Sequence, residues 1–356
     1  MSFKKRIFDT LNGRKHDRIP FFCFEELLPC GYFERKMRNS GMGLLLLSSP
    51  VSSFMPNVEI TKRMSSNLLE TIYATPKGRI SSKSHTGTKR IASAGWEVKT
   101  DFPIKSRSDY NALIYMIDDT VFNDDKYEFG LKEADMGEDG TQHIVGLMPQ
   151  YTEAELLMGL EKWSFEQYDN PAKFSLLLQS LEKRRDRLLG LMLSMDYSGL
   201  QHLGDISDNI SPENYIRYEV PHYRKTIKAL SNEKRKCGIH AHAKFLKKHT
   251  KWLAEVQPDF VESYTPPPYS DISLEELRKA IGDKVTILIN FPETVFYQGY
   301  RKTRHYTIKL LESDGSYNKA IGFSEMGLMG VNMQTRQIFE EGFMAVAEAV
   351  NEIKIY

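Results

Sequence analysis

The stretch that decides the fold is Cys237-Gly238-Ile239-His240-Ala241-His242-Ala243-Lys244-Phe245. It predicts a short buried strand that runs into the start of a helix. Successive side chains of a strand face opposite sides, so His240 and His242 point the same way and Cys237 points the other way. Two imidazoles at one strand end can hold a metal ion, or both can be hydrogen-bonded histidines of the core. The rest of the chain has to decide between these interpretations.

Short apolar runs like this one recur along the chain and alternate with helical segments. Helices are predicted over residues 107–117, 152–160 and 171–195, and the last carries one continuous apolar stripe. An early strand is predicted at Arg18–Phe22. The later predicted strands are Ile144–Leu147, Leu200–Gly204, Gly238–His240, Phe260–Tyr264, Val285–Phe291 and Ala320–Phe323. Such short, largely apolar runs are typical of parallel strands that are buried on both faces.

Strands that alternate with helices indicate either a (β/α)8 barrel or a doubly wound sheet. No glycine-rich phosphate-binding motif follows any predicted strand, which favours the barrel. Residues 42–105 differ, because their short alternating segments predict an additional group of β-strands. We therefore predict one (β/α)8 barrel domain over residues 1–356, with a β-rich excursion at about residues 42–105.

Composition excludes several classes of protein. The 48 Lys and Arg residues balance 47 Asp and Glu residues, and no basic stripe is interleaved with aromatic residues, so nucleic acid is not expected as a partner. No apolar segment is long enough to span a bilayer. The three cysteines are scattered, which predicts neither a disulfide framework nor a thiolate zinc cage. A cytoplasmic protein is the resulting expectation.

Polar residues follow the predicted strands at the points where these end. They are Asp205, Glu262, Tyr264, Asn290 and Glu325. The carboxyl ends of barrel strands share one face, so residues far apart in the sequence converge there. Any one of these residues could instead be a helix cap or a loop contact, but their recurrence predicts a polar pocket.

The two histidines would need a further ligand to hold a metal. A carboxylate such as Glu325 would add charge and a third ligand, and would leave a fourth position open for chemistry. Cys237 faces away from this site by strand parity. Nitrogen and oxygen ligands make the metal a stronger Lewis acid, suited to a substrate that reacts at oxygen. We therefore predict that His240, His242 and Glu325 bind one zinc ion.

Several segments together resemble the uroporphyrinogen decarboxylase superfamily, and more narrowly its corrinoid-dependent methyltransferase branch, including the methoxyaromatic O-demethylase methyltransferases. The similar segments are Gly204-Asp205-Ile206-Ser207-Asp208-Asn209, Ser211-Pro212, Pro221-His222-Tyr223, His240-Ala241-His242, Glu262-Ser263-Tyr264-Thr265-Pro266-Pro267-Pro268, Asp271-Ile272-Ser273-Leu274 and Asn290-Phe291-Pro292-Glu293. The resemblance runs through most of the chain and is strongest over residues 200–330. It implies a (β/α)8 barrel.

The resemblance also separates branches of the superfamily. Decarboxylases carry an arginine-rich segment where this chain has Pro20–Glu26, which is apolar and acidic and would repel a polycarboxylate. Branches that methylate thiols use His-x-Cys and a later Cys as zinc ligands. Here His242 stands where the first cysteine would fall, and Glu325 lies near the second. Zinc is therefore expected, and activation of a thiol is not.

The resemblance implies an enzyme that moves a methyl group from a methoxylated aromatic, or a similar small methyl donor, to the cobalt of a corrinoid protein. In this hypothesis Asp205 and Glu262 are catalytic, and Asn209, Tyr264 and Asn290 bind the substrate. The alternatives are transfer from a methylcorrinoid to an acceptor, a uroporphyrinogen decarboxylase-like reaction, and a non-catalytic ligand-binding barrel. Self-association of the chain into a homo-oligomer stays open.

Overall fold

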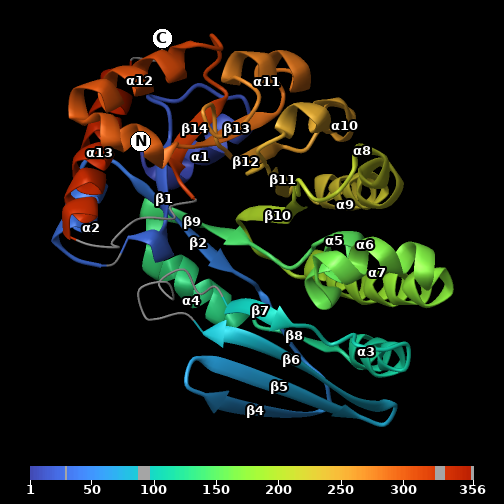
Figure 1. The fold of residues 1–356 in the computed structure, drawn as a ribbon. Helices are drawn as coiled ribbons and strands as arrows, with labels where there is room; N and C mark the ends of the chain where they lie inside the picture. Colours follow the sequence, from blue (N-terminus) through green and yellow to red (C-terminus); the bar gives the residue numbers. More distant parts are fainter. Residues whose placement is uncertain (29, 87–96, 325–332, 354–356) are drawn as a thin grey trace.

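The predicted barrel is confirmed by a computed structural model, which describes residues 1–28, 30–86, 97–324 and 333–353. Eight parallel strands close in the order β1-β14-β13-β12-β11-β10-β9-β2 (Figure 1). Their bounds are β1 Phe21–Phe24, β2 Gly43–Ser48, β9 Gly140–Ile144, β10 Leu200–Asp205, β11 Lys236–His240, β12 Phe260–Tyr264, β13 Thr286–Asn290 and β14 Lys319–Phe323. Because every strand is parallel to its neighbours, all the carboxyl ends lie at one mouth of the barrel.

Helices surround the barrel and connect its strands. The α-helices are α1 Phe3–Leu11, α2 Tyr32–Asn39, α3 Asp109–Asp118, α4 Lys126–Met136, α5 Gln150–Met158, α6 Leu160–Asp169, α7 Pro171–Ser194, α8 Pro212–Asn214, α9 Val220–Asn232, α10 Thr250–Val256, α11 Leu274–Ile281, α12 Tyr300–Glu312 and α13 Met333–Glu352. Short 3-10 turns are η1 Glu25–Leu27, η3 Gly137–Asp139, η5 Leu246–His249 and η6 Glu293–Gln298, and a π-helical turn, η4, spans Tyr215–Glu219. No helix within the described ranges combines the length and apolar character needed to span a membrane.

The amino end of the barrel is closed by α1. The side chains of Phe3, Ile7 and Leu11 pack with inward-facing strand residues such as Phe260 in one apolar cluster. Gly43 is required at the start of β2, because a Cβ atom there would lie 1.9 Å from the Phe3 ring. Among the described residues, side chains thus fill the lower half of the barrel, and we expect a ligand to approach from the carboxyl-end mouth.

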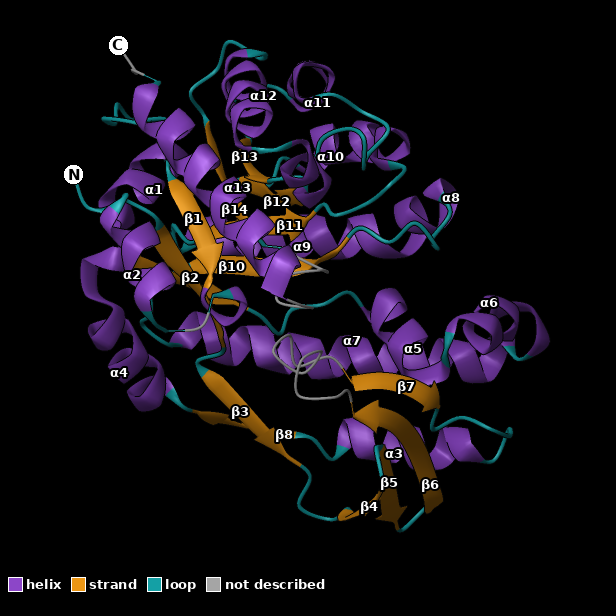
Figure 2. Ribbon diagram, turned by 60° about the vertical axis from the view of Figure 1, so that its left-hand side comes forward, coloured by secondary structure: helices purple, strands orange, loops and turns teal. Residues whose placement is uncertain are grey.

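Between β2 and β9 the chain forms two further sheets. They comprise the antiparallel pair β3 Val51–Phe54 and β8 Val121–Asp124, and the four-stranded sheet β4 Glu59–Ser65, β5 Leu68–Thr75, β6 Gly78–Thr86 and β7 Glu97–Asp101. The four-stranded sheet packs against α3 and lies at the edge of the molecule, away from α11 and α12 (Figure 2). Residues 43–48 were predicted to belong to the excursion, but they form barrel strand β2.

Two predicted strands are displaced by a few residues. The strand predicted at Arg18–Phe22 begins only after Pro20, which has no N–H to donate to a neighbouring strand. The strand predicted at Ile144–Leu147 ends at Ile144. Gly146 explains that end, because its φ of +125° breaks the extended backbone.

Candidate active site at the barrel mouth

Three imidazoles line one side of the upper barrel. His143, His202 and His240 come from the neighbouring strands β9, β10 and β11, and we call them the histidine row. The ring centroids of His143 and His202 are 5.4 Å apart, and those of His202 and His240 are 6.0 Å apart with nearly parallel planes. The sequence analysis predicted His240 here and missed the other two. For His202 a signal was available in the sequence, because it lies two residues after buried Leu200 and therefore shares its strand face.

His143, at one end of the histidine row, is buried among apolar neighbours. Nδ1 of His143 has no hydrogen-bond partner among the described residues, and the ring packs edge-on against Phe24. Burial lowers the pKa of His143 to about 3, against the opposing effect of Glu262. His143 is therefore a neutral imidazole at any physiological pH. It forms an uncharged wall of the mouth, next to the half-exposed side chain of Leu47.

A carboxylate lies beside each of the other two imidazoles. Nε2 of His202 lies 3.0 Å from Oδ1 of Asp205, whose side chain is 45% exposed, so this pair faces solvent. Burial alone would raise the pKa of the Asp205 carboxyl, but the hydrogen bond from His202 and the nearby imidazoles hold it below its ordinary value. Asp205 is consequently ionised at neutral pH, so its Oδ1 accepts a hydrogen bond from Nε2 of His202.

Glu262 is the deeper of the two carboxylates. Its Oε2 lies 2.6 Å from Nδ1 of His240, and its Oε1 accepts a hydrogen bond of 2.6 Å from the Ser263 hydroxyl. Burial would raise the pKa of Glu262, yet the charge and hydrogen bond of His240 lower it to about 2. An ionised carboxylate only accepts hydrogen bonds, so the proton of His240 stands on Nδ1.

His242 is fixed by a second set of contacts. Its Nδ1 lies 2.9 Å from Oγ1 of Thr265, and the Thr265 hydroxyl donates to the carbonyl oxygen of Ser263. The Asn290 amide also donates to Oγ1 of Thr265, so that oxygen accepts from His242 as well. Burial, and secondarily the charge of His240, lowers the pKa of His242 to about 4. The ring of Tyr269 packs over it at 4.1 Å.

Both predicted ligand histidines therefore carry their proton on Nδ1. In the neutral form of each ring the electron pair stands on Nε2, which is the arrangement that a carboxylate or hydroxyl partner imposes on metal-ligating histidines. The rings of His240 and His242 lie 6.2 Å apart between centroids. These donors are of the type that zinc prefers.

A complete ligand set is not assembled within the described residues. Glu325, the predicted third ligand, lies outside them. Among residues 1–28, 30–86, 97–324 and 333–353, no group of three or more His, Cys, Asp and Glu side chains has the geometry to hold a metal ion. The zinc site thus stays a prediction that rests on two imidazoles.

The other predicted site residues divide into two groups. Asn290 lies with the histidines, because its amide contacts Thr265 and its Oδ1 accepts from the backbone N–H of Ser324. Asn209 is exposed on the loop after β10 and donates to Glu155. Tyr264 is fully buried in the core outside the barrel, where its hydroxyl donates to a backbone carbonyl. The structure brings neither Asn209 nor Tyr264 into contact with the histidines.

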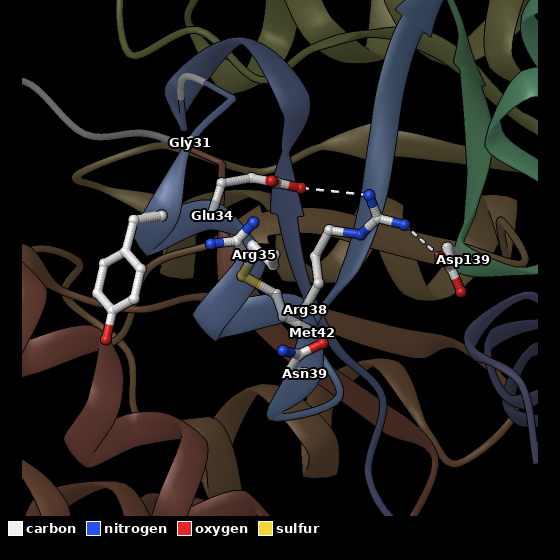
Figure 3. Close-up of a pocket in the computed structure, with 8 residues that line it drawn as sticks. Gly31, Glu34, Arg35, Arg38, Asn39, Met42 and Asp139 are labelled. Atoms are coloured by element: carbon white, nitrogen blue, oxygen red, sulfur yellow. Dashed lines mark hydrogen bonds and ion pairs between the residues drawn. The ribbon is translucent and has the colours of Figure 1, made fainter.

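A separate cavity of about 640 Å³ lies beside α2 (Figure 3). Its residues include Met42 and Asp139, which precede β2 and β9, so the cavity is at the amino end of the barrel. Arg38 points between Glu34 and Asp139 and forms an ion pair with each. Because the acids neutralise this guanidinium, the cavity offers less to an anion than its arginines suggest. The barrel mouth is the better candidate site.

No protein-family model matches the chain, and no curated protein matches it. Function therefore has to be argued from the geometry of the mouth and from the resemblance noted in the sequence.

Proposed function

We propose that the protein is a metal-assisted methyltransferase that moves a methyl group from a methoxylated aromatic, or a similar small methyl donor, to the cobalt of a corrinoid protein. One observation carries the proposal: the barrel mouth joins two imidazoles whose Nδ1 protons are held by Glu262 and Thr265 to a separate His202–Asp205 pair. The imidazoles of His240 and His242 could hold a Lewis-acidic metal ion, and the His202–Asp205 pair could transfer a proton.

The reaction breaks the O–CH3 bond of the donor and forms a Co–CH3 bond on the acceptor substrate. Phenolate is a mediocre leaving group, so the ether oxygen must be stabilised as the bond breaks, and it finally takes up a proton. A zinc ion held by His240 and His242 would supply Lewis acidity at that oxygen. His202 would supply the proton from Nδ1, because Asp205 accepts from its Nε2 and fixes the orientation of the ring.

Charge at the mouth supports this reaction over porphyrinogen decarboxylation. Glu25 and Glu26 follow β1 in the turn η1 and are both exposed. Burial, and secondarily the charge of Glu25, raises the pKa of Glu26. The two adjacent carboxyl groups make this part of the rim acidic. Such a rim opposes a polycarboxylate substrate and tolerates a neutral or singly charged aromatic ether.

The methyl acceptor must come to the mouth from outside. The lower barrel is filled by side chains from α1 and the strands, so a corrinoid has no room inside. Docking of the corrinoid protein should be transient, because that protein must leave with its methyl group. We therefore expect a modest interface and an affinity on the order of micromolar.

The test of this function is a methyl-transfer assay with a panel of methoxylated aromatics and zinc-loaded protein. Transfer to a reduced corrinoid protein is compared with transfer to free reduced cobalamin at equal cobalt concentration. We expect the protein-bound corrinoid to react about tenfold faster or more, because docking raises the effective concentration of cobalt at the mouth. Equal rates would contradict the proposal that a corrinoid protein is the methyl acceptor. Absence of transfer from every donor in the panel would contradict the methyltransferase function.

Asp205 offers a sharper test of the proton-transfer pair. Asp205→Ala and Asp205→Asn should each lower turnover by roughly 100-fold, because His202 loses the carboxylate that accepts from Nε2 and orients the ring. The melting temperature should hardly change, since the side chain is 45% exposed and carries little packing. Asp283→Asn is the matched control, because that carboxylate is 87% exposed and precedes β13 at the other end of the barrel. Normal turnover with a large loss of stability would make Asp205 a structural residue.

A further inference from the structure

Strand β12 contains an irregularity at Ser263. Its φ is +57°, a left-handed conformation that residues other than glycine rarely adopt inside a strand. The pairing of β12 with β13 shifts register between Val261 and Tyr264, so Ser263 is the extra residue of a β-bulge. Strained backbone of this kind is retained where the surrounding structure requires it, and it is common at functional sites.

The bulge changes which side chains face the barrel interior. Regular alternation would place Phe260, Glu262 and Tyr264 on one face of the strand. Phe260 does lie in the inner cluster, but Tyr264 lies in the outer core. Glu262 and Ser263 therefore both reach the mouth, where the Ser263 hydroxyl contacts Oε1 of Glu262 and the hydroxyl of Ser324.

Ser263 supports both imidazoles through two different atoms. Its hydroxyl holds the carboxylate of Glu262, whose other oxygen contacts His240. Its carbonyl oxygen accepts from the hydroxyl of Thr265, whose oxygen contacts His242. All five residues lie in the mouth, and Ser263 itself is completely buried.

We propose that Ser263 is a positioning residue that fixes the orientation and the Nδ1–H tautomer of His240 through its hydroxyl, and of His242 through its carbonyl. The left-handed bulge is what brings both atoms to the mouth. The consequence for catalysis rests on the proposed methyltransferase function, whereas the positioning can be measured without any turnover.

The test compares single substitutions in the full chain after dialysis against a chelator, so that a metal cannot itself fix the tautomers. Long-range ¹H–¹⁵N spectra of the imidazoles at constant pH report which nitrogen is protonated. With nine histidines in the chain, the signals can be assigned from His240→Gln and His242→Gln variants. Wild type should show one Nδ1–H tautomer for each ring. Ser263→Ala and Ser263→Gly should convert the His240 signal to a mixture of tautomers and leave His242 unchanged.

Thr265→Val provides the reciprocal variant, with His242 changed and His240 unchanged. Ser66→Gly is the matched control, because Ser66 has a φ of +55° in an exposed hairpin of the β4–β7 sheet. Glycine readily adopts that conformation, so Ser66→Gly should fold with an unchanged or higher melting temperature. In Ser263→Gly the relief of backbone strain opposes the loss of the buried hydrogen bond to Glu262, and the variant should still fold. Turnover of Ser263→Gly should fall about 10-fold to 100-fold, as for other residues that orient ligands.

Wild-type ring spectra in Ser263→Ala and Ser263→Gly would overturn the proposal, whatever their activity. Thr265→Val should alter the His242 spectrum alone. A change at both rings would also overturn the proposal, because the contacts through Glu262 and those through Thr265 would then not act separately. If the spectra change as expected but wild type transfers no methyl group, the positioning stands and the methyltransferase function fails. The two ideas are therefore tested independently.

Discussion

His240→Ala is expected to lower bound zinc from about one equivalent per chain to nearly none, and methyl transfer with it. The variant removes a ligand nitrogen and leaves the ionised carboxylate of Glu262 buried without its imidazole partner. Glu325→Ala should have a similar effect if that residue completes the ligand set. Glu262→Gln keeps the ring and changes only the acceptor of its Nδ1 proton, so we expect a smaller loss of zinc affinity, on the order of 10-fold to 100-fold.

Elemental analysis after gel filtration measures this prediction directly. His305→Ala is the matched control, because His305 is exposed on α12 and should keep full zinc and activity. Circular dichroism checks that each variant is folded. Full metal content in folded His240→Ala and Glu325→Ala would show that the ligand assignment is wrong.

Acidification is expected to destabilise the protein strongly between pH 6.5 and about pH 4. Burial lowers the pKa of His143 and His222 to about 3 and that of His249 to about 4. An unfolded chain binds protons on these rings below about pH 6.5, whereas the folded chain does not, so stability is present above pH 6.5 and is lost as pH falls. Three protons correspond to a slope of at most about 4 kcal/mol per pH unit.

Glu262 extends the effect to lower pH. Its pKa is lowered to about 2, so its contribution is present above its ordinary pKa and disappears as pH falls toward 2. Urea unfolding at pH 7, 6 and 5 measures the slope. His249→Gln should reduce it by about one proton, since the buried Nε2 of His249 has no partner among the described residues. His305→Gln should leave it unchanged. A free energy of unfolding that hardly varies over this range would contradict the prediction.

The alternation of strands and helices along the chain could be predicted, because it depends on local periodicity. Runs such as Val285–Phe291 are largely apolar, and Gly238 stands where the Phe260 ring leaves no space for a Cβ atom. Parity along β11 also placed His240 at the mouth and Cys237 in the outer core. These properties follow from residues that are near one another in sequence.

The partners of the site residues depended on the tertiary structure. Alternation along β10 could have placed His202 at the barrel interior, but the row that His143 and His202 form with His240 could not be predicted, because the alignment of strands in a closed barrel is not encoded in any one strand. Tyr264 was predicted to bind the substrate from its place at a strand end and from the resemblance, and regular alternation would put it on the face of Glu262. One extra residue in a strand reverses the side of every residue after it, so the bulge at Ser263 sends Tyr264 outward.

The sequence by itself determined most of the barrel strands, helices α3, α5 and α7, and most of the polar residues that end the strands, since these follow from periodicity and from the chemistry of single side chains. Only the tertiary structure decided which of those polar residues meet. The physical reason is that Glu262 contacts His240, and Thr265 contacts His242, across gaps of 22 and 23 residues. Such contacts depend on the register between strands and on the strained backbone of Ser263, which the packing of the whole barrel holds in place.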